Sequence, residues 1–390
     1  MRKRMDQRTF IIAIAVLCAF GMFLRWRGIW YVGVDYELCF EPWYMQLKNA
    51  GSLKALADWK QDYNIFYATI LYLLTLTSIE PIIGIKMVPI IFDYLEAFLL
   101  MKVAISISNE AEYSRFYGMI AFALVMCNPL SIIDGAYLAQ SDGIWSCLAL
   151  FGFWYIYQDK PVKGMWMLGF ALSMKLQAIF IMPIVLVIYF YRKKFTILHL
   201  LWIPVAIQAL CIPALIGGGS FDIAYRAFFN WVGEYPFMYY YYPNIWTYFQ
   251  EAPYYVFGKV AIVFAFVVLL MFAVLFVQSS RKHDLQDCLE YVAWTTMTAA
   301  MLLPCMHERY NFIAEIVLPV CAVFNKKLRI PALALIVIAT QCYGQSYLGW
   351  SRVSPYALAA GNLVLYFYLT WQCFYGLYNG CKAEKGAQVC

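Results

Sequence analysis

Residues 256–279 read VFGKVAIVFAFVVLLMFAVLFVQS, an almost unbroken apolar run with one early lysine, Lys259. About 20 apolar residues in a helix span the hydrocarbon core of a bilayer, so this run predicts a transmembrane helix. The whole chain has the same character, because 64% of its 390 residues are hydrophobic and only 13% are charged. Soluble domains carry roughly 25% charged residues. The sequence therefore predicts an all-α, polytopic membrane protein.

Comparable runs recur from end to end and predict about twelve membrane helices in a single integral membrane domain, residues 1–390. The expected spans lie near 10–28, 82–105, 115–129, 143–157, 164–175, 177–191, 196–216, 256–279, 290–305, 310–325, 330–347 and 360–379. Several are short, and we expect some pairs to be re-entrant or kinked. No cleavage site follows the first run, so an uncleaved first helix is expected.

Short basic clusters between the apolar runs predict the orientation, because cytoplasmic loops of membrane proteins are enriched in Lys and Arg. The clusters are Arg2-Lys3-Arg4, Lys160 with Lys163, Arg192-Lys193-Lys194, Arg281-Lys282, Lys326-Lys327-Arg329, and Lys382 with Lys385. The expected spans place all six on one side, with both termini cytoplasmic. The net charge of +6 is carried largely by such clusters, which argues against a nucleic-acid-binding face.

Residues 65–79 are apolar but too short to span easily, and a crossing there would invert every later basic cluster. We expect them to form a helix in or against the outer leaflet. The first outer loop then covers residues 29–81, and a second covers 217–255 with the aromatic stretch YPFMYYYYPNIW. Those aromatic residues suit either an interfacial belt or a platform for a sugar ring or lipid headgroup.

Two acidic constellations are expected on the outer face. Asp35 and Glu37 follow the first span, where a carboxylate could reach a substrate hydroxyl, or where both acids are simply exposed. Gln140 and Asp142 lie in the turn NPLSIIDGAYLAQSDGIW. There Ser141 or Asp142 is equally suited to capping the helix that begins near residue 143.

Two basic constellations complete the set. Lys175, with Gln177 two residues later, lies between apolar runs and needs either a bound anion or a carboxylate partner such as Asp93 or Glu96. A structural role is favoured for those two acids.

The second basic constellation is the outer turn MHERY, residues 306–310. It combines His307, Glu308, Arg309 and Tyr310, and arginine suits planar recognition of phosphate. The alternative is a salt-bridged surface turn.

At these residues the sequence resembles the GT-C superfamily of multi-pass glycosyltransferases, which use polyprenyl-phosphate sugars. The branch it resembles contains the dolichyl-phosphate-glucose glucosyltransferases, the GPI-anchor mannosyltransferases and their bacterial relatives. Asp35-Tyr36-Glu37 followed by Trp43 resembles the acidic motif and tryptophan of the first outer loop. Asp62-Tyr63 resembles its D-Y-P-P segment, with Asn64 and Ile65 in place of the prolines.

Three further motifs follow in the family's order. AYLAQSDGIW resembles the W-G-Q-x-D turn, with Leu138 and Ala139 where Trp and Gly would stand. MKLQAIFIMP resembles the K-x-Q…P helix, and MHERYNF resembles the H-E-[RK]-Y signature of bacterial members.

The resemblance implies an inverting hexosyl transfer in which Asp35 is the general base. Arg309, Lys175 and His307 would bind the donor phosphate. Supporting positions would be Glu37, Trp43, Asp62, Tyr63, Gln140, Asp142, Gln177, Glu308 and Tyr310. No cofactor is expected, and a divalent ion on Asp35 and Glu37 is not favoured.

The expected partners are a polyprenyl-phosphate sugar, a glycan, glycolipid or protein acceptor, and membrane lipid. The resemblance to bacterial members implies a bacterial plasma membrane with the active site facing outward. A transporter or flippase of a lipid-linked sugar is one alternative, disfavoured because no internal repeat is evident. A polysaccharide polymerase or ligase that uses a pyrophosphate donor is another.

Overall fold

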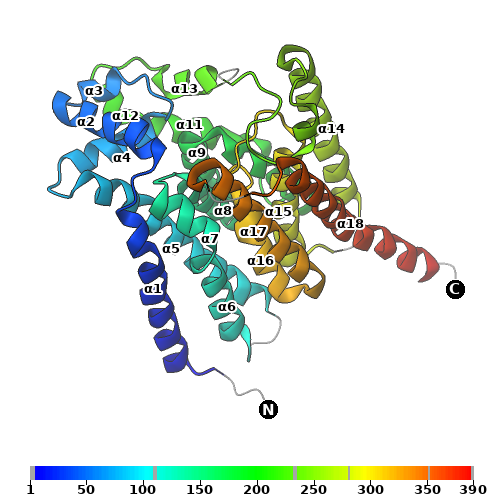
Figure 1. Cartoon of the computed structure of the whole chain (residues 1–390). Coiled ribbons are helices and arrows are strands. Elements are labelled where there is room, and N and C mark those ends of the chain that lie inside the picture. Colours follow the sequence, from blue (N-terminus) through cyan, green and yellow to red (C-terminus); the bar gives the residue numbers. More distant parts are fainter. Residues whose placement is uncertain (1–4, 109–111, 232–234, 280–281, 350–351, 388–390) are drawn as a thin grey trace. The chain divides into compact units, whose positions relative to one another are not determined.

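The computed structural model describes residues 5–108, 112–231, 235–279, 282–349 and 352–387. Within these ranges every regular element is a helix and no strand is present (Figure 1). The all-α class is therefore confirmed. Arg2, Lys3, Arg4 and Arg281, which belong to the basic clusters that predict the orientation, lie outside the described residues.

The helices follow the predicted apolar runs closely. The α-helices are α1 Gln7–Ile29, α2 Glu41–Ala50, α3 Lys54–Ala57, α4 Ile65–Thr75, α5 Pro81–Ile107, α6 Ser114–Met126, α7 Pro129–Ser131, α8 Asp142–Tyr157, α9 Pro161–Met174, α10 Met182–Arg192, α11 Trp202–Leu210, α12 Ile212–Ile216, α13 Ile223–Trp231, α14 Tyr254–Gln278, α15 Leu285–Leu302, α16 Phe312–Phe324, α17 Arg329–Tyr343 and α18 Pro355–Ala387. Short 3-10 segments are η3 Leu176–Ile181, η4 Ile197–Leu201, η5 Ile245–Phe249 and η6 Lys326–Leu328, and π-helical segments are η1 Tyr36–Phe40, η2 Ile132–Tyr137 and η7 Gly344–Leu348.

The number of clear membrane spans is smaller than the twelve predicted. Among the described residues, α1 and α14 are long and apolar enough to cross a bilayer, and α6 with the bent segment Pro129–Tyr137 makes a third if the pair is one span. Most of the other predicted runs form helices shorter than 18 residues, such as α8 with 16, α9 with 14 and α16 with 13. In addition, the 27-residue α5 carries four charged side chains, and the run 196–216 is broken into η4, α11 and α12.

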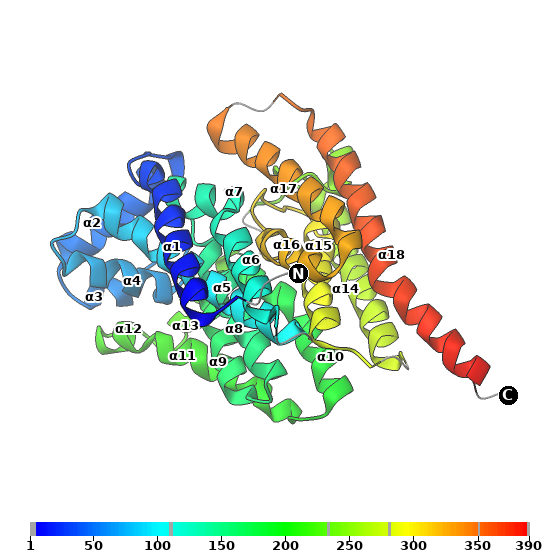
Figure 2. The ribbon, with the colours of Figure 1, turned by 90° about the horizontal axis from the view of Figure 1, so that it is seen from below.

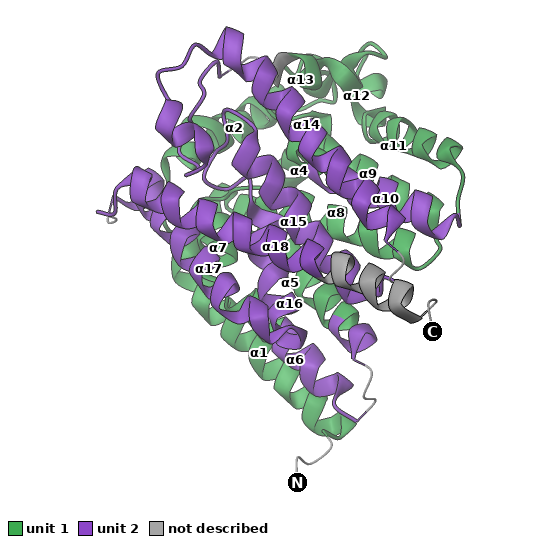
Figure 3. Ribbon diagram, turned by 90° about the vertical axis from the view of Figure 1, so that its right-hand side faces the viewer, with its two compact units in different colours: residues 1–103, 122–179, 195–234 green, residues 104–121, 180–194, 235–390 purple. Residues whose placement is uncertain are grey.

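The chain divides into two compact units built from interleaved segments (Figure 3). Unit 1 contains residues 1–103, 122–179 and 195–234, and unit 2 contains 104–121, 180–194 and 235–390. In unit 1, α9 packs between α8 and α11, and α4 also contacts α9. In unit 2, α15 packs against α14, α16 and α18 (Figure 2).

Residues 29–81, predicted to be the first outer loop, contain the short helices α2, α3 and α4, which pack on one another beyond the end of α1 (Figure 1). α4 has 11 residues, about half of the length that a membrane span needs. Its length agrees with the expectation that residues 65–79 do not cross the membrane.

The buried side chain of Arg25 joins four helices, α1, α5, α6 and α7, through an ion pair and further hydrogen bonds. Arg25 of α1 is 0% exposed, and its Nε donates to Asp93 Oδ2 at 2.9 Å. Its other nitrogens donate to Met126 O at 2.8 Å and Ser131 Oγ at 2.6 Å. Glu96, one turn beyond Asp93, accepts a bond of 2.5 Å from Ser146 Oγ. The structural role favoured for both acids fits these contacts.

The Arg25–Asp93 pair gives a prediction for stability. Arg25→Met should destabilise the protein by about 3–5 kcal/mol, because it leaves a buried carboxylate without its cation. Equilibrium unfolding in mixed detergent micelles measures this loss. Arg27→Met, at an exposed position of the same helix, should change stability by less than about 0.5 kcal/mol. Equal losses in the two variants would contradict the prediction.

Candidate functional site

Asp35 and Gln140, 105 residues apart in sequence, are joined directly in unit 1: Gln140 Nε2 donates to Asp35 Oδ2. Asp35 immediately precedes the π-helical η1, and Gln140 follows the end of η2. Irregular helical segments of this kind often occur at functional sites. Gln140 is 1% exposed, and its Oε1 has no hydrogen-bond partner among the described residues.

The turn that presents Gln140 is strained at the preceding residue. Ala139 has φ of 59°, in the left-handed region that favours glycine. An alanine there costs about 1–2 kcal/mol. Strain of this kind persists where surrounding contacts enforce it, as the Asp35–Gln140 bond does here.

Lys175 pairs with Asp142 at the start of α8. Its Nζ lies 2.7 Å from Asp142 Oδ2, and Trp145 Nε1 donates to the other carboxylate oxygen at 2.8 Å. The suggestion that Lys175 pairs with Asp93 or Glu96 is therefore wrong, because Arg25 and Ser146 bind those acids. Ser141 occupies the N-cap position of α8 without a side-chain cap bond, so the simple capping explanation is wrong for that residue.

Tyr63 links the first outer loop to this pair. Lys175 Nζ lies 5.6 Å from the centre of the Tyr63 ring, and Ser141 Oγ donates to Tyr63 Oη at 3.1 Å. The Trp43 ring lies 5.6 Å from that of Tyr63, and Trp59 Nε1 donates to Tyr63 O at 2.6 Å. We call Asp35, Tyr63, Gln140, Asp142 and Lys175 the first cluster.

Asn64, directly after Tyr63, stands at the start of α4. Its side chain accepts from Ile65 N at 2.8 Å as the N-cap of α4, and donates to Ala224 O at 3.1 Å. The amide thus caps α4 and ties the loop before it to the backbone of α13.

Three other predicted residues lie beside the first cluster in sequence. Glu37 and Asp62 have exposed side chains, and Gln177 is half-buried in η3. Their supporting roles stay predictions.

A second cluster belongs to unit 2 and surrounds the MHERY turn. Arg309 Nη1 donates to Glu308 Oε1 at 2.8 Å and also to Tyr347 Oη. The side chain of Glu308 is 1% exposed, whereas that of Arg309 is 11% exposed. Tyr347 lies in the π-helical η7, and no local pattern in the sequence marked it as a partner.

Tyrosines of the second outer loop enclose His307. The rings of Tyr240 and Tyr235 lie 4.4 and 6.0 Å from the His307 ring, and Tyr310 lies 4.9 Å away. The loop backbone is also tied to the turn, since Cys305 N donates to Met238 O at 3.1 Å and Tyr242 N to Met306 O at 3.0 Å. Tyr235 and Tyr310 therefore lie beside the second cluster. We define this cluster as Tyr240, His307, Glu308, Arg309 and Tyr347.

Burial and charge act in opposite directions on Glu308. Burial raises its pKa, but the contact with His307 and the positive charge of Arg309 outweigh burial and lower the pKa from an ordinary 4.5 to about 2. Glu308 is therefore a carboxylate at neutral pH that holds Arg309 in place.

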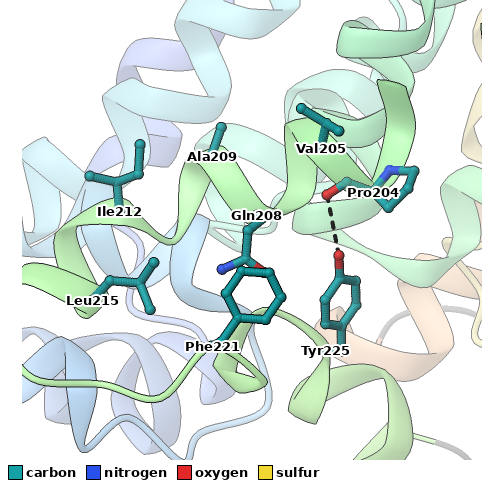
Figure 4. A pocket seen from close by; sticks show the side chains of 8 residues that line it. All are labelled: Pro204, Val205, Gln208, Ala209, Ile212, Leu215, Phe221 and Tyr225. Atoms are coloured by element: carbon teal, nitrogen blue, oxygen red, sulfur yellow. Dashed lines mark hydrogen bonds between the residues drawn. The ribbon is translucent and has the colours of Figure 1, made fainter. Parts of the chain in front are cut away.

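An apolar cavity of about 410 Å³ lies elsewhere on unit 1, on α11, α12 and α13 (Figure 4). It is lined by Pro204, Val205, Gln208, Ala209, Ile212, Leu215, Phe221 and Tyr225. Gln208 brings the one side-chain amide into this lining, and neither of its polar atoms has a partner in the described part of the chain. None of the predicted site residues lines the cavity.

The described residues contain no group of three or more His, Cys, Asp or Glu side chains suited to a metal ion. The expectation of no metal or other cofactor stays a prediction. No protein-family model matches this sequence, and no curated protein matches it significantly.

The low pKa of Glu308 predicts a pH-dependent contribution to stability. Because its pKa is lower in the folded state, this contribution is present above about pH 4.5 and is lost as the pH falls towards 2. Glu308→Gln should therefore cost on the order of 3 kcal/mol at neutral pH, and the difference from wild type should narrow below about pH 4.5. Measuring the free energy of unfolding of both proteins from neutral pH down to about pH 2 tests this prediction. The exposed Glu251→Gln is the control, and a constant difference for Glu308→Gln would refute the prediction.

Proposed function

We propose that this chain is a multi-pass membrane glycosyltransferase that transfers a hexose, mannose or glucose, from a polyprenyl-phosphate donor to an acceptor hydroxyl. The observation that carries the proposal is the first cluster. Residues of four separate motifs meet in it, through the Gln140–Asp35 bond, the Lys175–Asp142 pair and the Tyr63 ring. Packing alone gives little reason for two carboxylates, a lysine and an amide to gather in so apolar a chain.

Asp35 is the proposed general base of a single displacement. The acceptor oxygen bonds to the anomeric carbon as its proton passes to Asp35, and the bond from that carbon to the phosphate oxygen breaks. The electron pair of that bond leaves with the polyprenyl phosphate. Gln140 orients the carboxylate through its Nε2, and its unpartnered Oε1 is available to accept a bond from a sugar hydroxyl.

The negative charge that develops on the phosphate needs cations. Arg309 supplies a guanidinium in unit 2, with His307 two residues before it, and Lys175 supplies an ammonium in unit 1. Each is held by an adjacent carboxylate, which fixes its position before the substrate binds.

The acidic D-Y-E motif and the glutamine turn support the GT-C assignment. Ala139 stands where the family's turn has glycine, and its φ of 59° is a conformation that glycine prefers. The apolar cavity on α11–α13 is a candidate for part of the lipid chain, because its walls are almost wholly hydrocarbon (Figure 4).

The full topology is also part of the proposal. About twelve segments enter the membrane, with both termini cytoplasmic and both clusters at the outer face of a bacterial plasma membrane. Three of the four charges of α5 do not oppose this arrangement, because Lys86, Asp93 and Glu96 are buried and hydrogen-bonded to other parts of unit 1.

A panel of polyprenyl-phosphate sugars, incubated with the purified protein and followed by mass spectrometry of the product, tests the function. Transfer in detergent without any gradient supports the glycosyltransferase, whereas gradient-dependent movement without transfer supports the transporter. Activity with a pyrophosphate donor but not a monophosphate donor supports the polymerase or ligase.

Asp35→Asn removes the proposed base while keeping the size of the side chain. Turnover should fall by about 10²–10⁴-fold, with donor binding retained. Asp58→Asn changes an exposed acid of the same loop and should leave turnover close to wild type. Near-normal turnover in Asp35→Asn would exclude this residue as the base.

Arg309→Ala removes the guanidinium proposed to bind phosphate. Donor affinity should fall by about tenfold or more, since a charge-assisted hydrogen bond contributes about 1.5–3 kcal/mol. Binding of a non-hydrolysable donor analogue measures this directly. Arg352→Ala, at an exposed arginine of the same unit, is the matched control. Unchanged affinity in Arg309→Ala would put the phosphate site elsewhere.

A further inference from the structure

Lys86 is a fully buried lysine in α5 whose ammonium is surrounded by backbone oxygens. It is 0% exposed, and its Nζ donates to Gly28 O at 2.7 Å, Tyr31 O at 2.5 Å and Tyr137 O at 2.9 Å. A lysine ammonium has three N–H donors. These three carbonyl groups therefore use its full donor capacity.

The three carbonyl groups belong to two segments that leave helices and lead to the first cluster. Gly28 and Tyr31 lie at and just after the end of α1, and the chain reaches Asp35 four residues beyond Tyr31. Tyr137 is the last residue of η2, three residues before Gln140. The carbonyl groups at a helix end lack partners within the helix and carry partial negative charge, so an ammonium there is favourable.

The two segments are already in close contact where Lys86 joins them. A Cβ atom on Gly28 would lie 2.5 Å from the Tyr137 ring, and the Tyr31 and Tyr137 rings are 5.8 Å apart. One ammonium thus fixes the distance between the two segments at this point. Asp35 and Gln140 meet again a few residues later.

Neutralising a nearby acid does not explain Lys86. Asp93, about two helical turns further along α5, is bound by Arg25 at 2.9 Å. An uncharged side chain of similar length would avoid the cost of burying an ammonium, which amounts to several kcal/mol even after relaxation. A residue with three fixed donors offsets that cost by tying three backbone groups together.

We infer that Lys86 is a positioning residue that sets Asp35 in register with Gln140. The inference rests on the role proposed for Asp35. Removing the ammonium should let the two segments move apart while leaving the helices that flank them folded.

Hydrogen exchange on the full-length protein in detergent, with Lys86→Met, tests the inference independently of any enzymatic activity. Backbone amides of residues 31–37 and 138–141 should exchange roughly tenfold faster or more, with α8 and α9 unchanged. Lys102→Met, the same change at an exposed lysine of α5, should have no effect on these segments. If Lys86→Met does not fold, Lys86→Gln keeps two donors and should give a smaller increase confined to the same residues.

Kinetics provide the second readout. If Lys86 positions the base, kcat should fall by as much as about 10²-fold while the donor KM changes little. Unchanged exchange at both segments would overturn the inference, as would faster exchange throughout unit 1, which indicates a merely structural role. Faster local exchange in a protein without transferase activity would overturn the proposed function and leave the positioning role in place.

Discussion

Backbone carbonyl groups at the ends of helices have no hydrogen-bond donor within the helix, and in an apolar environment they need one from elsewhere. In unit 1, two buried cations donate these hydrogen bonds. Lys86 binds carbonyl groups after α1 and at the end of η2, and Arg25 binds Met126 O at the end of α6. Without these donors each open carbonyl would cost about 1–3 kcal/mol. The turns that carry Asp35 and Gln140 depend on these hydrogen bonds, because both turns follow the end of a helical segment.

The two clusters share an electrostatic pattern. In each, the cation proposed to bind phosphate is already paired with a buried carboxylate, Lys175 with Asp142 and Arg309 with Glu308. Such a pair limits the rotamers of a long, flexible side chain before substrate arrives, so less entropy is lost on binding. It also keeps a buried cation from standing without a counter-charge.

Much of the fold could be predicted from hydropathy, because apolar runs and helices coincide along nearly the whole chain. The points at which an apolar run divides into separate helices were harder to predict. The run 196–216 reads as one span, yet it divides into η4, α11 and α12, since hydropathy does not encode helix geometry. Asp35, Gln140, Asp142 and Lys175 were found because polar groups in an apolar chain are conspicuous, whereas Tyr63 was found through the family resemblance. Their pairing was not predicted, since Asp93 and Glu96 were the carboxylates expected beside Lys175, whereas Asp142 is its partner. The sequence did not mark the roles of Arg25, Lys86 and Tyr347, because their partners are distant along the chain. Two partners of Lys86 are moreover backbone carbonyl groups of tyrosines, which no side-chain pattern reveals.

The three π-helical segments have a consequence for how the chain can change. Asp35 stands at the start of η1, η2 ends three residues before Gln140, and Tyr347 lies within η7. A π-helical turn holds one residue more than the α-helical turn it replaces. Losing one residue from η2 would replace this wider turn by an α-helical one and shorten the segment that leads to Gln140 by one residue. The Gln140–Asp35 bond would then have to form across a shorter connection, although every side chain of the cluster was still present. In these segments the length of the chain, as well as its side chains, therefore sets the geometry of the cluster.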